Sequence, residues 1–376
     1  MIDDILGEPK RPATPIETEA HDQLNSLLRE LLSIHGSDLH LQVGRPPTLR
    51  LDGKLLHGTL PPVGADDLRR MVFSIMNDEQ RERFRENLEL DLSYELEEEA
   101  RFRVNVFIQR EQIGAAFRLI PIRVGTIDDW GLPQILKKLS FQPRGFILIT
   151  GPTGSGKSTT LAAMIEHVNL TAHKHIITIE DPIEFAFLDK KSIIEQREVG
   201  VDTHSFADAL RHIMRQNPDV IMVGELRDLE TIDLALQAAE MGSLVMATLH
   251  TRTAYQTVDR VIDVFPSEQQ AQVRLQLATS LSAVISQTLV PHASGAGRKS
   301  AFEIMVCNDA IRNAIREGKP QQIPSLIQAG SQYGMKLMDK ALQEMVVARD
   351  VKYEDVIHKV ADPKRFEELA GFYKGI

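Results

Sequence analysis

Residues 146–158 read FILITGPTGSGKS, an apolar run followed at once by a glycine-rich loop. The pattern GxxxxGK[ST] runs from Gly151 to Ser158, and a short apolar run before it is typical of a buried parallel strand. Glycines let backbone N–H groups curl around a phosphate, and a helix that starts there adds its positive end. The segment therefore predicts a phosphate-binding loop between a buried strand and a helix.

The loop also predicts which groups bind a nucleotide. Lys157 is expected to reach the β- and γ-phosphates of ATP, and the Ser158 hydroxyl to ligate Mg²⁺. A glycine-rich turn with a chance lysine is the alternative, but the strand before it and the helix after it favour a nucleotide site. We therefore predict that ATP and Mg²⁺ bind here, with Ser158 as the metal ligand and with Gly151, Pro152, Thr153, Gly154, Ser155, Gly156, Lys157, Ser158 and Thr159 as the binding residues.

More short apolar runs alternate with helical patterns after the loop. Strands are expected at 176–180, 220–224 and 244–249, and helices at 206–215 and from 229 to a cap at Gly242. Such alternation predicts a mostly parallel α/β sheet covered by helices. After about Pro266 we expect helices, over residues 268–287, 309–316, 322–329 and 334–348.

Polar groups follow each of these strands. Glu225 comes after one strand and is expected to orient or deprotonate the attacking water, because hydrolysis needs a base in line with the γ-phosphorus. His250 follows another and is a candidate γ-phosphate sensor. A solvated acid and a structural histidine are the alternatives at these two positions. Among Glu180, Asp181 and Glu184, at least one is expected to be structural, because one water and one Mg²⁺ need fewer acids.

The first third of the chain has a different pattern. A helix is expected at 22–34, and alternating polar and apolar residues predict strands at 38–43, 48–51, 54–56, 90–96, 102–108 and 114–120, with a type I′ turn at Asp52–Gly53. This predicts a small α+β domain at 21–121, after a flexible tail at 1–20 and before a linker at 122–128. Arg101, Arg103, Arg110 and Arg118 lie on or near polar strand faces, where they are either solvated or aimed at a nucleotide of a neighbouring subunit.

Composition limits the classes of partner. The net charge of −10 argues against a nucleic-acid partner, because phosphate backbones need clustered Lys and Arg. Cys307 is the only cysteine, so no intramolecular disulfide or paired-cysteine zinc site can form. No apolar run of about 18 residues occurs, and no signal peptide is recognisable at the N-terminus. We therefore expect a cytoplasmic protein without a membrane span.

Several motifs together resemble a known family. GPTGSGKST (151–159), TIEDPIEF (178–185), RQNPDVIMVGELRD (215–228) and TLHT (248–251) look like the secretion-type ATPases of pilus machines. SDLHL (37–41), RFRVN (101–105) and AIRNAIREGK (310–319) are similar to the PilT-like retraction ATPases, the PilT/PilU branch of that superfamily. The resemblance runs from about Leu24 to Ala348.

The resemblance implies a PAS-like N-terminal domain followed by a RecA-like ATPase domain at 129–376, with a helical C-terminal part from about 267. It implies a hexameric ring that hydrolyses Mg-ATP between the two domains to power type IV pilus retraction and twitching motility. The implied partners are an inner-membrane platform protein and a paralogous pilus ATPase, at the inner face of the cytoplasmic membrane. The residues that match functional positions of the family are Glu225, Glu184, His250, Arg103 and Arg118.

Two positions depart from the family pattern. Ser243 stands where a histidine is usual, and Ala314 where a leucine is usual. These changes leave open an accessory or regulatory paralogue that modulates a partner motor, with or without turnover of its own. An extension or type II secretion ATPase is less favoured, because those proteins usually carry a four-cysteine metal motif. A nucleic-acid motor on the same core is opposed by the acidic charge.

Overall fold

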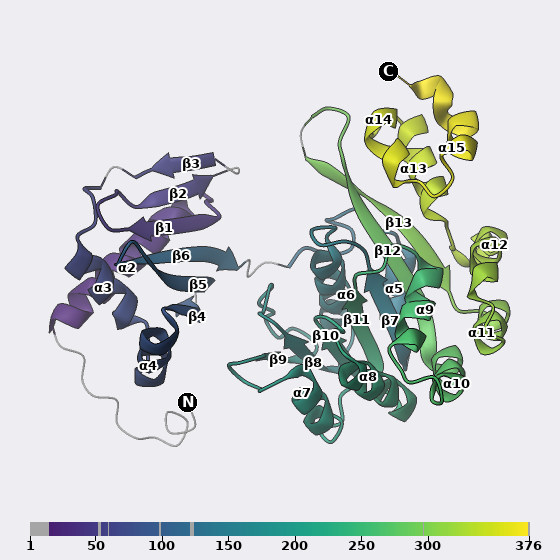
Figure 1. The fold of residues 1–376 in the computed structure, drawn as a ribbon, viewed down its shortest axis with the longest axis horizontal. Helices are drawn as coiled ribbons and strands as arrows, with labels where there is room; N and C mark the ends of the chain where they lie inside the picture. Colours follow the sequence, from purple (N-terminus) through teal and green to yellow (C-terminus); the bar gives the residue numbers. More distant parts are fainter. Residues whose placement is uncertain are drawn as a thin grey trace. The chain divides into compact units, whose positions relative to one another are not determined.

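The computed structural model describes residues 15–51, 54–58, 60–97, 99–120, 124–295 and 297–374. The chain divides into two compact units, Met1–Ile122 and Arg123–Ile376 (Figure 1), and this division falls at the start of the predicted linker. The predicted Asp52–Gly53 turn and residues 1–14 of the predicted tail lie outside the described residues.

The first unit contains an antiparallel sheet of six strands in the order β3-β2-β1-β6-β5-β4. The predicted strands are confirmed with shifts of one or two residues at their ends. The helices α3 and α4 were not predicted, although Asn77 and Gln80 form a capping box at the start of α4. The elements are α2 (Pro15–Ser33), β1 (Asp38–Gln42), β2 (Thr48–Leu51), β3 (Lys54–His57), α3 (Ala65–Ser74), α4 (Asp78–Asn87), β4 (Glu89–Leu96), β5 (Ala100–Gln109) and β6 (Gln112–Ile120).

Helix α2 begins inside the segment predicted as a tail. Pro15 stands at its start, where proline is tolerated because the first N–H groups of a helix have no partner within it. The apolar stripe of α2 extends back to Ala20, which is buried together with Leu24 and Leu28. The residues 15–20 are therefore helical and not a tail.

The two faces of the first sheet differ in polarity. Leu39, Phe117 and Val104 lie opposite one another on successive strands and are buried. The neighbouring row, on the other face, is Asp38, Arg118 and Arg103. Ile108 departs from the predicted alternation because it is 37% exposed near the end of β5, and so does β3, where the neighbouring Leu55 and Leu56 are both exposed. The general α+β prediction is confirmed, and the PAS-like label stays a prediction.

The second unit contains a sheet of seven strands in the order β13-β12-β7-β11-β10-β8-β9. All neighbours are parallel except β12 and β13. The strands are β7 (Gly145–Thr150), β8 (His175–Glu180), β9 (Ile193–Glu198), β10 (Val220–Val223), β11 (Leu244–Leu249), β12 (Leu281–Pro291) and β13 (Arg298–Val306). Those predicted before residue 266 are confirmed, and β9 was missed because its side chains are mostly not buried.

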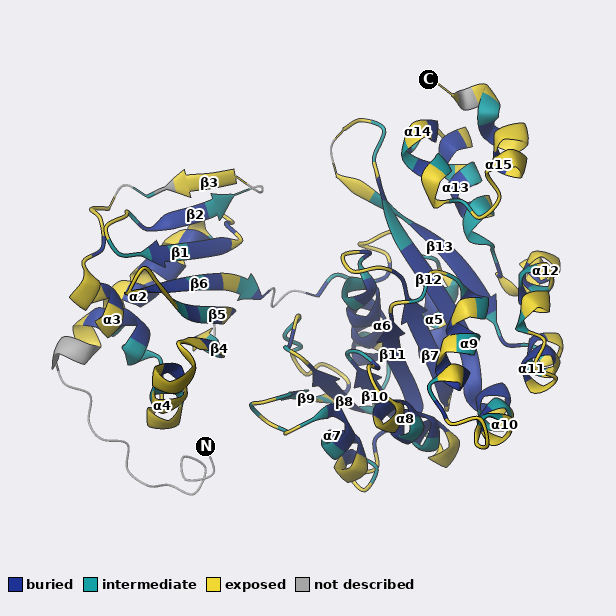
Figure 2. Cartoon of the chain, in the orientation of Figure 1, coloured by how far each residue is buried: buried dark blue, intermediate teal, exposed yellow. Residues whose placement is uncertain are grey.

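Helices cover both faces of this sheet, as the α/β pattern predicts. One face packs against α5 (Ile135–Ser140) and α6 (Lys157–Thr171). The other packs against α7 (Phe206–Ile213), α8 (Leu229–Met241), α9 (Ala254–Asp263) and α10 (Gln270–Ser280). Figure 2 shows the strands between them as buried along most of their length. The sheet is therefore the central layer of this unit.

The prediction of helices after Pro266 was partly wrong. The predicted helix 268–287 ends at Ser280, and the chain continues as the antiparallel hairpin of β12 and β13. The apolar residues Val273, Leu277, Leu281 and Val284 keep a helical spacing across the helix end, which hid the start of the strand. The hairpin adds two strands to the sheet beside the glycine-rich loop.

Helices do form the end of the chain. They are α11 (Asp309–Arg316), α12 (Ile323–Ala329), α13 (Met338–Val347), α14 (Tyr353–Val356) and α15 (Pro363–Ala370), with short 3-10 turns at Pro320–Gln322, Ser331–Tyr333, Ile357–Lys359 and Gly371–Tyr373. Helices α13 to α15 share a small core with Val290 and Ala301 of the hairpin, and Figure 1 shows the hairpin reaching toward them. No helix within the described ranges is long and apolar enough to cross a bilayer.

Candidate active site

The ends of the parallel strands bring the predicted site residues together. Thr150 lies opposite Leu249, and Val223 lies opposite both Ala247 and Ile179, so four strands end at nearly the same level. The segments that follow them line a cavity of about 1210 Å³. Ligands of open α/β sheets bind at this carboxyl edge. The cavity therefore lies where a nucleotide is expected.

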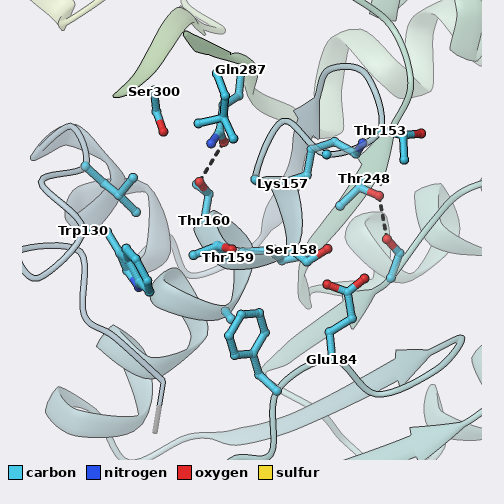
Figure 3. Close-up of a pocket in the computed structure, with 18 of the residues that line it drawn as sticks. Trp130, Thr153, Lys157, Ser158, Thr159, Thr160, Glu184, Thr248, Gln287 and Ser300 are labelled. Carbon is cyan, nitrogen blue, oxygen red and sulfur yellow. Dashed lines mark hydrogen bonds between the residues drawn. The ribbon is translucent and has the colours of Figure 1, made fainter. Parts of the chain in front are cut away.

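Glycines of the loop allow a close approach to β12. Gly151 has φ of 141°, and a Cβ there would lie 2.2 Å from the carbonyl oxygen of Gln287. Gly156 has φ of 89°, and a Cβ placed there would lie 2.8 Å from the side-chain nitrogen Nε2 of Gln287. The Thr160 hydroxyl donates to Gln287 Oε1 at 2.7 Å, a bond drawn in Figure 3. Gln287, which was predicted inside a helix, thus holds the loop and α6 against the sheet.

Lys157 occupies the first position of α6 and is buried. Its ammonium group donates to the carbonyl oxygens of Gly151, at 2.9 Å, and Pro152, at 3.2 Å. Burial lowers the pKa of Lys157, while the negative charges of Glu225 and Glu184 act in the opposite direction. An ammonium group at this position is held where it can meet a phosphate.

His250 lies between Lys157 and Glu225. Its Nδ1 is 3.5 Å from the Lys157 ammonium nitrogen, and its Nε2 is 2.7 Å from Glu225 Oε1. Because Lys157 can only donate, Nδ1 accepts and the ring proton sits on Nε2, from which it is donated to Glu225. The histidine therefore couples the lysine of the loop to the acid that follows β10.

Glu225 has a second partner in Arg227. Glu225 Oε2 accepts from Arg227 Nε at 3.1 Å, and Arg227 also donates to Asp181 Oδ2 at 3.0 Å. The bond with Glu225 is the largest cause that raises the pKa of Arg227. Both oxygens of Glu225 are thus oriented by side chains at the cavity. A carboxylate in this setting can accept a proton from a water held beside it.

The acids that follow β8 have different surroundings. Glu180 is buried and accepts from Thr178 Oγ1 at 2.7 Å, Gln196 Nε2 at 3.0 Å and the Glu184 N–H at 3.3 Å. Burial raises the pKa of Glu180. Glu184 is exposed at the cavity wall (Figure 3). Glu180 therefore serves the fold of this segment, and Glu184 is available to a ligand.

The side-chain oxygens at the cavity suit a magnesium ion whose remaining ligands come from a nucleotide and water. No group of three or more His, Cys, Asp or Glu residues that could hold a metal occurs in the part of the chain that the structure describes. Mg²⁺ does not need such a group, because it usually keeps several waters and binds through one or two carboxylates and substrate phosphates. Ser158, Glu184 and Glu225 line the cavity and supply the oxygen ligands that this ion prefers.

The predicted loop residues are placed around the same cavity. Thr153, Gly154, Gly156, Lys157, Ser158 and Thr159 line it, whereas Ser155 is buried behind them, and its hydroxyl has no partner within the described residues. Trp130 and Gln287 also line the cavity and were not predicted. As isolated residues far from the loop in sequence, they carried no motif that could have revealed them.

The predicted arginines belong to the first unit. Arg118 lies on β6, and its Nε donates to Asp38 Oδ1 at 2.9 Å. Arg103 is exposed on β5 directly opposite Arg118 in the strand register. The two guanidinium groups therefore share one face of the first sheet, and their approach to a nucleotide stays a prediction.

The two departures from the family pattern lie away from the cavity. Ser243 precedes β11, and its hydroxyl donates to the Pro218 carbonyl oxygen at 2.9 Å. Because parallel strands run in one direction, this position is at the opposite edge of the sheet from His250. Ala314 is buried in α11 beside Ile311 and Ile315. Neither residue is among those that line the cavity.

Comparison with known proteins shows which family has this sequence and fold. The model of the family described as "Type II/IV secretion system protein" matches residues 21–358. The chain belongs to this family. A type IV pilus retraction ATPase, PilT of Pseudomonas aeruginosa, is 50% identical over 330 residues, which are 88% of this chain and 96% of that protein.

Two further likenesses extend over most of the chain. The type IV pilus ATPase PilU of Pseudomonas aeruginosa is 39% identical over 335 residues, which are 89% of this chain and 88% of that protein. A crystal structure of the pilus retraction motor PilT with bound ADP has a TM-score of 0.86 and 45% identity, and the match covers 92% of this chain and 98% of that one. The mixed α/β architecture is therefore that of a secretion-type ATPase.

Proposed function

We propose that this chain hydrolyses ATP and uses the energy to retract a type IV pilus. The observation that carries the proposal is the 50% identity with a retraction ATPase over nearly the full length of both proteins. Identity that extends over 88% of this chain is stronger support than a phosphate-binding loop alone, which also serves kinases and GTPases. The Lys157, His250 and Glu225 chain supplies the groups that hydrolysis needs at the same cavity.

Each residue then has a role in hydrolysis. Lys157 and the loop N–H groups bind the phosphates, and Ser158 would hold Mg²⁺, which would neutralise negative charge on the phosphates. Glu225 accepts the proton of the attacking water while His250 and Arg227 fix the two carboxylate oxygens. Glu184, which lines the same cavity from the segment after β8, would accept a hydrogen bond from a water bound to the ion. His250 senses whether a γ-phosphate is present and passes this on to Glu225 through their hydrogen bond.

A neighbouring subunit would complete the site. The arginines among the described residues that line the cavity are Arg227 and Arg298, and Arg227 is engaged by two carboxylates. Phosphoryl transfer gains greatly from an arginine aimed at the developing charge. Arg103 and Arg118 are exposed on one face of the first sheet and would supply this arginine from a neighbouring subunit. The likeness to a pilus retraction ATPase supports the further proposal of a homo-hexameric ring at the cytoplasmic face of the inner membrane, in contact with a platform protein of the pilus machine.

An accessory pilus ATPase is the second candidate. The specific observation that favours it is the 39% identity with PilU over 89% of this chain. The identity with PilT is higher over a similar length, so a retraction motor is the first choice. In the accessory case, the chain would act together with a paralogous motor. An extension or type II secretion ATPase is a weaker candidate, because no comparison above favours it over a retraction motor.

The proposal is tested by deleting the gene and counting surface pili. Loss of a retraction motor leaves excess pili and stops twitching. Bald cells would instead indicate an extension motor. Normal piliation, with a defect that appears only when a paralogous ATPase is weakened, would support the accessory role. Plasmid-borne wild-type protein should restore the original pilus number, and the Lys157→Ala variant should not.

A further inference from the structure

The cavity is larger than a triphosphate requires. Its volume of about 1210 Å³ exceeds the range of about 300–1,000 Å³ that is typical of small-molecule sites. Glu184, Glu225 and His250 mark the end where the terminal phosphates would lie. The opposite end is lined by Trp130 and Leu132 before α5, by Leu289 and residues 298–300 of the hairpin, and by Met345 of α13.

Figure 3 shows how these ends are separated. Ser158 and Thr159 lie in the middle, Glu184 and Thr248 lie on one side of them, and Trp130 and Ser300 lie on the other. Because a P-loop lysine reaches the β- and γ-phosphates, the rest of the nucleotide must extend away from the carboxylates. The base is therefore directed toward the end that contains Trp130.

The position of Trp130 is fixed by a tight turn. The Thr126 N–H donates to Asp129 Oδ2 at 2.9 Å, and the Asp129 N–H donates to Thr126 Oγ1 at 3.1 Å. The indole rests on Gly125, where a Cβ would lie only 2.3 Å from Trp130 Nε1. Yet 54% of Trp130 is exposed. The turn thus presents a large aromatic ring to the cavity in a defined orientation.

We propose that Trp130 stacks on the adenine base of the bound nucleotide and that this end of the cavity is the nucleobase subsite. Every base has a π face, and stacking on an exposed aromatic side chain removes both surfaces from water. Leu132, Leu289 and Met345 offer apolar surface at the same end. The Lys299–Asp350 ion pair, at 2.8 Å, joins the hairpin to the segment after α13 there. This inference rests on the proposed ATPase function.

Intrinsic fluorescence tests the proposal directly, because Trp130 is the only tryptophan of the chain. The full-length protein is titrated with Mg-ADP and, separately, with Mg-tripolyphosphate, and binding of each is measured by calorimetry. Stacking predicts that ADP changes the Trp130 emission and that tripolyphosphate binds without that change. Equal changes with both ligands, or ADP binding with no change, would overturn the assignment.

A relocated tryptophan is the matched control. Phe141 is 46% exposed, packs on His167 and does not line the cavity. In the double variant Trp130→Phe, Phe141→Trp, the emission should not distinguish ADP from tripolyphosphate. A difference of the wild-type size in this variant would show that ADP acts through the whole unit and not by stacking on Trp130.

Substitutions measure how much the stacking contributes. Trp130→Ala should raise the ADP dissociation constant and the KM for ATP about 5- to 100-fold, with tripolyphosphate affinity and kcat within about twofold of wild type. Trp130→Phe should recover most of the affinity. Gly125→Ala keeps the indole but forces it aside, so it should also weaken ADP binding.

Unchanged ADP affinity in Trp130→Ala would refute the subsite. Tripolyphosphate affinity reports whether the loop is still folded in each variant. Since the binding measurements need no hydrolysis, a wild-type protein that binds ADP through Trp130 but releases no phosphate would refute the ATPase function and leave the subsite standing.

Discussion

Replacing Glu225 by glutamine removes the proposed base with little other change. The glutamine Oε1 can still accept from His250 Nε2, which lies 2.7 Å from the present carboxylate oxygen. The charge that oriented Arg227 is lost, but Arg227 keeps Asp181 as a partner. The substitution therefore removes the proton acceptor but keeps most of the hydrogen bonds that hold the site together.

The structure sets the expected magnitudes. Loss of a general base lowers kcat by about 10²–10⁴, which corresponds to roughly 3–5 kcal/mol of barrier. The Glu225 and Arg227 side chains are 25% and 54% exposed, so their screened ion pair contributes about 1 kcal/mol or less to stability. For a unit of this size, that corresponds to a fall in Tm of up to about 4 °C.

The assay is phosphate release by the purified full-length protein, together with ADP binding and thermal unfolding. Glu230→Gln is the matched control, because Glu230 is exposed in the first turn of α8, does not line the cavity and pairs with Arg211. It should leave kcat within twofold. If Glu225→Gln also kept kcat within threefold while it bound ADP normally, Glu225 would not be the base.

Three further predictions concern other parts of the second unit. Lys157→Ala should weaken ADP binding about 10- to 100-fold, because a charge-assisted bond to phosphate is lost; calorimetry would measure this, and unchanged affinity would contradict the assignment. Ile311→Ala should cost about 2–5 kcal/mol of unfolding free energy because Ile311 is fully buried. Arg316 is exposed on α11, within the segment 310–319 that is similar to the retraction ATPases, so we expect Arg316→Ala to keep Tm and phosphate release but to stop pilus retraction. An unchanged Tm in Ile311→Ala, or normal retraction in Arg316→Ala, would contradict these two roles. Burial raises the pKa of Glu303, so the folded chain holds its proton more tightly than the unfolded chain, whose reference pKa is 4.5. The free energy of unfolding of wild type relative to Glu303→Gln should therefore fall as pH rises from below 4.5 through the raised pKa, as urea titrations would measure, and a pH-independent difference would contradict this.

The sequence predicted the parallel strands β7, β8, β10 and β11 because each is a short apolar run with a polar residue at its end, whereas the parallel strands β9 and β12 were missed. The level of those ends, and with it the approach of Glu225 to His250, follows from the strand register and could not be deduced from the runs themselves. The residues themselves left Glu180 and Glu184 as alternatives and the family resemblance favoured Glu184; the burial of Glu180, which periodicity does not reveal, supplies a physical reason for that choice.

The misses have identifiable physical causes. The start of β12 was hidden because its apolar residues continue the helical spacing of α10. The helical start of α2 was obscured by Pro15, which breaks helices in their interior but is accepted in the first turn. Gln287 acts through a tertiary contact with α6 and Trp130 lines the cavity from the segment before α5, so no local pattern marks either residue.

The central claim is that hydrolysis at the Glu225 site drives pilus shortening. Its most direct test follows labelled pili in living cells that lack the chromosomal gene and express either wild-type protein or Glu225→Gln at equal abundance. The account predicts that pili extend in both strains and shorten only with the wild-type protein. Shortening at the wild-type rate with Glu225→Gln would contradict the claim.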